Sequence, residues 1–195
     1  MLLTAEATKY KTAKMFQLLY APIGKVGERF VVAKSDAEQI ATPFAAFESH
    51  DPQLVHMDRI ASRLLELGEL RPDSISQFLA YFMILESLLT HNPDPKDPSD
   101  SITRQVKNKV PLLNHRWSPA LDYSAFQGMK EDAIWSKMYG YRSTLAHVDV
   151  PDFSRGDLAS LGNHANAITL LKSTVKAVAR LALIDPQLVA DLKKC

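Results

Sequence analysis

The order of hydrophobic and polar residues predicts helices along most of the chain beyond its first quarter. Apolar residues recur at helical spacing over residues 54–67, and Gly68 ends that segment. A second helix is predicted to begin at Asp73 or Ser74 and to run to about His91. Its apolar residues surround the axis on nearly every side, which is typical of a helix at the centre of a bundle.

Proline-rich and glycine-containing segments separate the later helices. Residues 92–100 contain three prolines within six residues and therefore form an exposed connection. A third helix is predicted to start at Ser99 or Ser101, with four apolar residues facing inward: Ile102, Val106, Val110 and Leu113. Residues 117–128 form a loop. A long amphipathic helix is expected from about Asp157 to Ile184, and a short one over residues 186–194 closes the chain.

The fourth predicted helix ends in the segment 134–147, which carries two neighbouring stripes. Ile134, Met138, Tyr141 and Leu145 form an apolar stripe, and Ser136, Gly140, Ser143 and His147 form a stripe of small or polar residues. Such a helix packs into a bundle on one face and leaves the other open to close approach. Arg142 lies near the edge of the apolar stripe, so its guanidinium should emerge from a packed wall.

The N-terminal quarter is less regular. Residues 4–20 have helical character, residues 29–33 are the only plausible strand, and Phe44 and Phe47 are expected to hold this arm onto the body. We place the boundary near residue 51, with an N-terminal extension over 1–51 and a helical bundle over 52–195. The predicted fold is all-α, an up-and-down helical bundle with a partly irregular N-terminal arm.

The amino-acid composition excludes some classes of protein and site but does not indicate a function. The chain has 195 residues, 46% hydrophobic and 23% charged, which is ordinary for a globular protein. A net charge of +1 gives no global argument for nucleic-acid or membrane binding. The single cysteine, Cys195, excludes an intrachain disulfide and a cysteine metal site. Because no apolar run reaches about 18 residues and the N-terminus lacks a signal-peptide core, we expect a cytoplasmic protein without a membrane segment.

The most informative chemistry is the pair Arg142 and His147. Arginine offers a permanent positive charge and a planar donor fork that suits phosphate, and histidine exchanges a proton near neutral pH. Together they supply what RNA cleavage without a metal requires. Residues five apart on a helix lie about 140° apart around its axis, so one helix would not direct both at one phosphate. Either the helix ends before His147, or two copies of the chain share the site. The alternative is a surface arginine with a histidine at a helix C-terminus.

Three further features are open to two interpretations each. Glu86 is a lone carboxylate in an apolar helix, so we expect it to pair with Arg142 or Arg104, either as a core ion pair or as a support for Arg142. The helix over 102–116 carries a basic face that is either simply solvated or a track for RNA phosphates: Arg104, Lys107, Lys109, His115 and Arg116. Trp117 and Trp135 are expected in the core or an interface. The remaining histidines have no ligand spacing, so we infer no metal and no cofactor.

Three segments in order resemble the HEPN domain superfamily, and its Apea-like branch most closely. They are Phe82-Met-Ile-Leu-Glu86-Ser-Leu-Leu89, then Arg104, then Trp135 followed by Tyr139-Gly-Tyr-Arg142-Ser143-Thr-Leu-Ala-His147. The similarity covers roughly residues 72–150. Val148 departs from this branch, which often has glycine after the histidine, and a β-branched residue resists the positive φ that glycine permits.

The resemblance implies an all-α bundle that dimerises and brings two R-x4-H motifs into one cleft. It implies metal-independent endoribonuclease activity in toxin, phage-defence or RNA-processing systems, with RNA as substrate and an antitoxin as a possible partner. Ser143, together with Arg104 and Lys107 of the basic face, is expected to bind the substrate. Arg104 would also be a supporting position in the family. By position, Arg142 and His147 would be catalytic. Glu86 would support them. Two alternatives are an inactive HEPN-like module that binds RNA, nucleotide or a partner protein, and a purely structural bundle.

Overall fold

A computed structural model describes residues 14–15, 19, 38, 40–41, 44–45, 47 and 55–195 except 98, 127 and 148. The described residues form six α-helices and two 3₁₀-helices and contain no strand, so the chain is an all-α protein. The expected strand over residues 29–33 and the departure at Val148 lie outside the described residues. None of the helices that can be assessed has the length and apolar character needed to cross a bilayer.

The α-helices begin and end close to the positions that the sequence predicts. Their bounds are α3 (Val55–Leu67), α4 (Ile75–Leu89), α5 (Ile102–Asn114), α6 (Glu131–Ala146), α7 (His164–Ile184) and α8 (Pro186–Lys194). Short 3₁₀-helices, η2 (Ser124–Phe126) and η3 (Gly156–Leu161), lie before and after α6. Side-chain caps explain several starts, because Ser74, Ser101 and Asn163 each accept a hydrogen bond from a backbone N–H in the first turn that follows.

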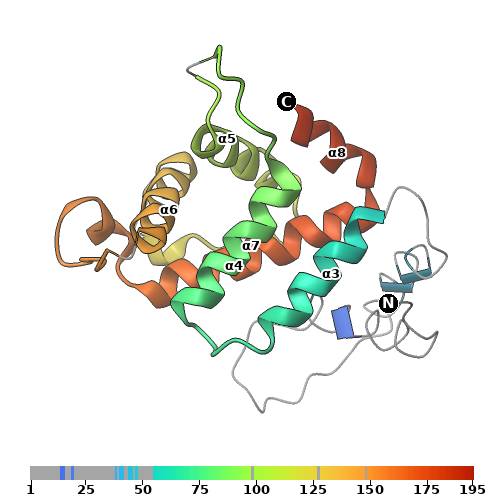
Figure 1. Ribbon diagram of the computed structural model, residues 1–195, viewed down its shortest axis with the longest axis horizontal. Helices are drawn as coiled ribbons and strands as arrows, with labels where there is room; N and C mark the ends of the chain where they lie inside the picture. Colours follow the sequence, from blue (N-terminus) through green and yellow to red (C-terminus); the bar gives the residue numbers. More distant parts are fainter. Residues whose placement is uncertain are drawn as a thin grey trace.

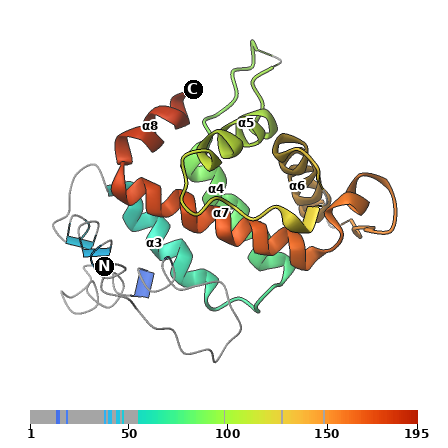
Figure 2. The same ribbon diagram turned by 180° about the vertical axis from the view of Figure 1, so that it is seen from behind.

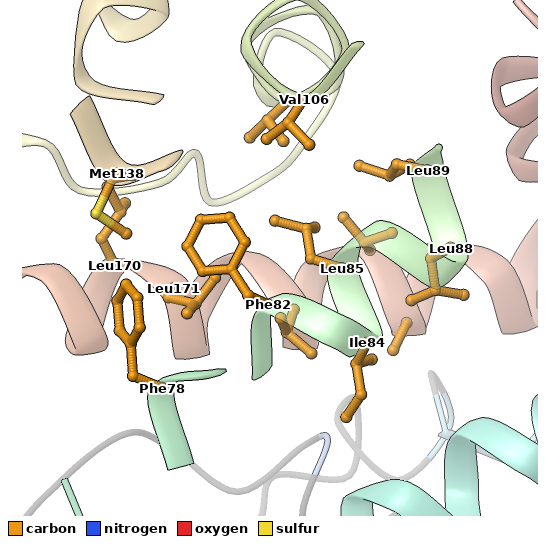
Figure 3. Close-up of a cluster of buried hydrophobic side chains, with 14 of the residues drawn as sticks. Phe78, Phe82, Ile84, Leu85, Leu88, Leu89, Val106, Met138, Leu170 and Leu171 are labelled. Carbon is orange, nitrogen blue, oxygen red and sulfur yellow. The ribbon is translucent and has the colours of Figure 1, made fainter. Parts of the chain in front are cut away.

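Helix α4 lies at the centre of the arrangement. It crosses the long α7 and also packs against α3, α5, α6 and α8 (Figures 1 and 2). Its inward residues meet residues of three other helices, among them Val106 of α5, Met138 of α6 and Leu171 of α7 (Figure 3). All of these side chains are almost completely buried. The all-round apolar pattern of residues 75–89 therefore reflects a helix that contacts neighbours on most sides.

One prediction about helix bounds is wrong. The single long helix expected from Asp157 to Ile184 is divided into η3 and α7. Gly162 ends η3 with a φ of 75°, a conformation that glycine adopts without the steric cost a side chain adds. Asn163 then caps α7, its side chain accepting a hydrogen bond from the backbone N–H of Asn166. The apolar periodicity continues from η3 into α7, which explains why the sequence pattern predicted one helix.

The few described residues of the N-terminal quarter contact the core. Met15 and Leu19 are buried in it, and Ile40, Phe44 and Phe47 are partly buried against it. This confirms the expectation that Phe44 and Phe47 pack on the helical body. The predicted boundary between an extension over 1–51 and a bundle over 52–195 stays a prediction.

Asp73 fastens the turn between α3 and α4 to the start of α7. Its carboxylate accepts a hydrogen bond from the Lys172 ammonium at 2.6 Å, and its backbone carbonyl oxygen lies 2.8 Å from Nε2 of His164. Its backbone N–H donates to the Gln77 side chain at 3.0 Å. Asp73 has a φ of 55°, the left-handed region that aspartate tolerates better than most residues. Both the side chain and the left-handed backbone conformation of Asp73 therefore stabilise this turn.

We expect Asp73→Ala to lower the free energy of unfolding by about 1–2 kcal/mol, because alanine is strained at this φ and cannot bind Lys172. Asp73→Gly is the matched variant, since it loses the same ion pair but accepts the backbone conformation without strain. Urea unfolding of both proteins should place glycine between alanine and wild type. An alanine variant as stable as the glycine variant would contradict the role assigned to the backbone.

Candidate functional site

Helix α6 presents its predicted apolar stripe to the core. Ile134, Met138, Tyr141 and Leu145 are all buried, as the spacing predicted. Trp135 is also fully buried, and its indole N–H donates to the Tyr123 hydroxyl at 3.0 Å. This anchoring fixes the rotation of α6 about its axis, and it therefore fixes which residues emerge at its edges.

Arg142 emerges where α6 meets α4, and it pairs with Glu86. Its Nε lies 3.4 Å from Oε1 of Glu86, and its Nη2 donates to Oε2 at 3.4 Å. The Arg142 side chain keeps 30% of its surface exposed, against 16% for Glu86. Of the two arginines proposed as partners for Glu86, Arg142 is the one that pairs with it. The guanidinium is thus paired with a carboxylate of α4 and remains accessible to solvent.

Tyr139 supports the same guanidinium from its own helix. The Arg142 Cζ lies 5.7 Å from the centre of the Tyr139 ring, a cation–π distance. The Tyr139 ring in turn packs edge-to-face with Phe82 of α4, with ring centres 6.3 Å apart. Sequence reasoning gave Tyr139 no role. Its position three residues before Arg142 on one helix face was the available signal, because such pairs are neighbours on a helix surface.

Burial and charge act in opposite directions on Glu86. Burial is the larger effect and raises the pKa of this carboxyl, while the charge of Arg142 and its hydrogen bond lower it. The net direction is upward. In addition, Oε1 is buried and accepts no hydrogen bond from the described residues, although Nε of Arg142 lies 3.4 Å away. That contact is an ion pair without hydrogen-bond geometry, so the carboxylate is only partly satisfied.

His147 follows Ala146, the last residue of α6, so the helix ends before this histidine, as the first of the two alternatives expected. Its backbone N–H donates to the carbonyl oxygen of Ser143 at 3.1 Å, and its side chain is exposed. Its φ of −90° and ψ of 7° lie in the bridge region rather than in the α-helical region. Within the described part of the chain, no hydrogen bond or ion pair involves the His147 ring. Ser143 is half-buried on the same side of α6, and Gly140 borders open space.

The predicted basic face of α5 is only partly correct. Arg104 is exposed and Lys107 half-exposed, as a phosphate-contacting surface requires. Lys109 is buried instead, and its ammonium donates to the carbonyl oxygen of Leu89 at 2.9 Å. It therefore neutralises the C-terminal end of α4, where helix carbonyls lack partners. Burial lowers the pKa of this lysine.

The chain direction brings Arg104 and Lys107 toward the end of α6 that carries Arg142. Asn114, at the end of α5, donates to Glu131, at the start of α6, at 3.0 Å, and the two helices pack side by side. The first turns of α5 consequently run back along the last turns of α6. No described hydrogen bond or ion pair joins Arg104 or Lys107 to Arg142 or Glu86. These cations lie on a neighbouring helix rather than within the Glu86–Arg142 cluster.

Among the residues that the structure describes, no three His, Cys, Asp or Glu side chains gather in a way that could hold a metal ion. The fold and its Glu86–Arg142–Tyr139 cluster are thus those of an all-α protein with a supported, solvent-accessible arginine. Comparisons with known proteins add no family assignment, because no family model, curated protein or solved structure matches the chain.

Proposed function

We propose that this chain is a metal-independent endoribonuclease of the HEPN type, built as an up-and-down helical bundle that acts as a homodimer. The observation that carries the proposal is Arg142, a guanidinium fixed by Glu86 and Tyr139 with 30% of its side chain exposed. An arginine held in this way is suited to binding a phosphate, because its donor fork is preorganised before the ligand arrives. The resemblance of segment 135–147 to the HEPN motif supports the same role.

The proposed chemistry needs a proton carrier as well as a cation. His147 would remove the proton from an RNA 2′-hydroxyl, whose oxygen attacks the adjacent phosphorus. The bond from phosphorus to the 5′-oxygen then breaks, and the protonated His147 returns the proton that it took to that leaving oxygen. The products are a 2′,3′-cyclic phosphate and a free 5′-hydroxyl. Arg142 would stabilise the charge that develops on the phosphoryl oxygens, with Ser143 positioning the phosphate and Arg104 and Lys107 guiding the RNA backbone.

The separation of Arg142 and His147 favours a site completed by a second copy. Residues five apart on a helix lie about 140° apart around its axis, and His147 is exposed with no described contact to Arg142. A dimer in which the α6 helices face each other would bring Arg142 of one copy near His147 of the other.

The direct test is RNA cleavage in EDTA by wild type, Arg142→Ala and His147→Ala. We expect cleavage by wild type without added metal and a loss of at least about 10²-fold in each variant. Arg59→Ala and Glu66→Ala are control variants, because both residues are exposed on α3 and outside the proposed site. They should cleave like wild type. Cleavage that survives in both site variants, or that requires a metal, would reject the mechanism.

A second candidate is an inactive HEPN-like module that binds RNA, nucleotide or a partner protein. The pairing of Arg142 with Glu86 favours it, since a guanidinium that keeps an internal carboxylate is less available to a scissile phosphate. Wild-type protein that binds RNA through Arg142 but never cleaves it would select this candidate. An antitoxin or another partner protein belongs with either candidate, in a toxin, phage-defence or RNA-processing setting.

A further inference from the structure

The contact between Arg142 and Glu86 is loose for a pair of opposite charges. Both of its distances are 3.4 Å, whereas charge-assisted N–H···O bonds are commonly about 2.7–2.9 Å. Only one of the two contacts has hydrogen-bond geometry, and the buried Oε1 accepts no hydrogen bond from the described residues. The carboxylate nevertheless contacts the Nε and Nη2 edge of the guanidinium, which is one of the two donor edges that could bind a phosphate.

Burial of Glu86 and its pairing with Arg142 act against each other. Burial raises the pKa of Glu86 even with Arg142 beside it, which means that the attraction does not fully offset the cost of burying the charge. A carboxylate retained in that position calls for a reason other than holding the helices together. Arg142 has a second support in the Tyr139 ring, and this contact does not depend on Glu86.

We propose that Glu86 is an internal competitor for Arg142: its carboxylate occupies the guanidinium in the free protein, and an RNA phosphate replaces it on binding. Tyr139 keeps the guanidinium in place during the exchange. This inference rests on the function proposed above, because it concerns the same arginine. Glu86 is then a gate rather than a fixed support, meaning a group that blocks Arg142 until it is displaced. Only a ligand that makes further contacts with the protein can displace it.

The charged groups around Glu86 make the exchange sensitive to pH. Arg142 faces it from α6, while Lys193 of α8 and Lys109 of α5 reach α4 at the backbone oxygens of Ser87 and Leu89. In the described part of the chain, Arg142 is thus the cation that contacts the carboxylate. When the pH falls below the raised pKa of Glu86, the carboxyl becomes neutral and stops competing. As the pH rises through that pKa, the competitor returns and phosphate binding weakens.

The test measures binding of a short, fully 2′-O-methylated oligoribonucleotide, which cannot undergo attack by a 2′-hydroxyl. We compare wild type, Glu86→Gln, Arg142→Gln and the double variant by fluorescence anisotropy at low salt. Glu86→Gln should bind about fivefold more tightly than wild type at neutral pH, because glutamine fills the same space without the competing charge. Glu66→Gln removes an exposed carboxylate on α3 and controls for the general effect of one fewer negative charge.

Two comparisons make the result specific. In the Arg142→Gln background, Glu86→Gln should have no effect on affinity, since the group for which it competes is gone. The gain in affinity on acidification should be larger in wild type than in Glu86→Gln, because only wild type carries the Glu86 carboxyl. The gate is refuted if Glu86→Gln binds no better than Glu66→Gln, or if no variant binds the oligonucleotide. A wild type that shows the expected binding but never cleaves unmodified RNA would reject the ribonuclease and leave the gate intact.

Discussion

Mixing the Arg142→Ala and His147→Ala proteins restores RNA cleavage that neither variant performs alone. This is the expected result if each phosphate is bound between two copies of α6. A heterodimer of the two variants retains one arginine and one histidine, contributed by opposite copies to one cleft. If both groups instead acted within one chain, every chain in the mixture would lack one of them, and mixing would restore nothing.

The size of the recovery follows from random exchange of subunits. About half of the dimers are then heterodimers, so cleavage should rise to at most about half of the wild-type rate. Against single variants reduced by at least about 10²-fold, that is a large effect. Initial rates on a fluorogenic RNA, measured in EDTA after incubation of the mixture, give the comparison.

Mixing Arg142→Ala with Arg142→Gln is the control, since no pairing of those chains supplies the arginine. Sedimentation of wild type as a monomer at micromolar concentration would argue against the shared site.

Sequence reasoning succeeded where structure is determined locally. Helix starts at Ser74 and Ser101 follow from side chains that cap the backbone within a few residues. The inward face of α6 follows from the 3.6-residue period. The division between η3 and α7 was missed because apolar residues keep their spacing across it, while the positive φ of Gly162 is set by the packing of both segments.

The site could be predicted only in part, because its contacts are tertiary. A lone carboxylate in an apolar helix indicated that Glu86 needs a cation, but two arginines satisfied that requirement equally well. The choice of Arg142 depends on how α6 is rotated against α4, and the two residues are 56 positions apart in the chain. Lys109 shows the same limit. Its helical spacing from Val106 and Leu113 places it on the inward face, but the sequence does not show that the end of α4 provides a carbonyl acceptor for it there.

We expect Phe82→Ala to lower the free energy of unfolding by about 3–5 kcal/mol. Phe82 is fully buried on the central helix, next to Phe78 at a ring separation of 5.3 Å (Figure 3). Removing its ring leaves a cavity among helices α4, α6 and α7 that neighbouring side chains fill only in part. A loss of this size is a large share of the about 5–15 kcal/mol that typically separates folded from unfolded domains. Chemical denaturation followed by circular dichroism measures it.

Met83→Ala is the matched control, because Met83 is the next residue on the same helix and is 51% exposed. Its effect should stay within about 0.5 kcal/mol. Phe82 also packs against the Tyr139 ring, and that ring contacts Arg142. Removing Phe82 should therefore weaken the positioning of Arg142 as well as the core. Phe82→Leu preserves most of the buried volume but removes the aromatic ring that contacts Tyr139. We expect it to weaken oligonucleotide binding by more than its modest loss of stability explains. If Phe82→Leu instead binds like wild type, the ring contact does not position Arg142, and the Glu86 carboxylate alone determines where the guanidinium lies.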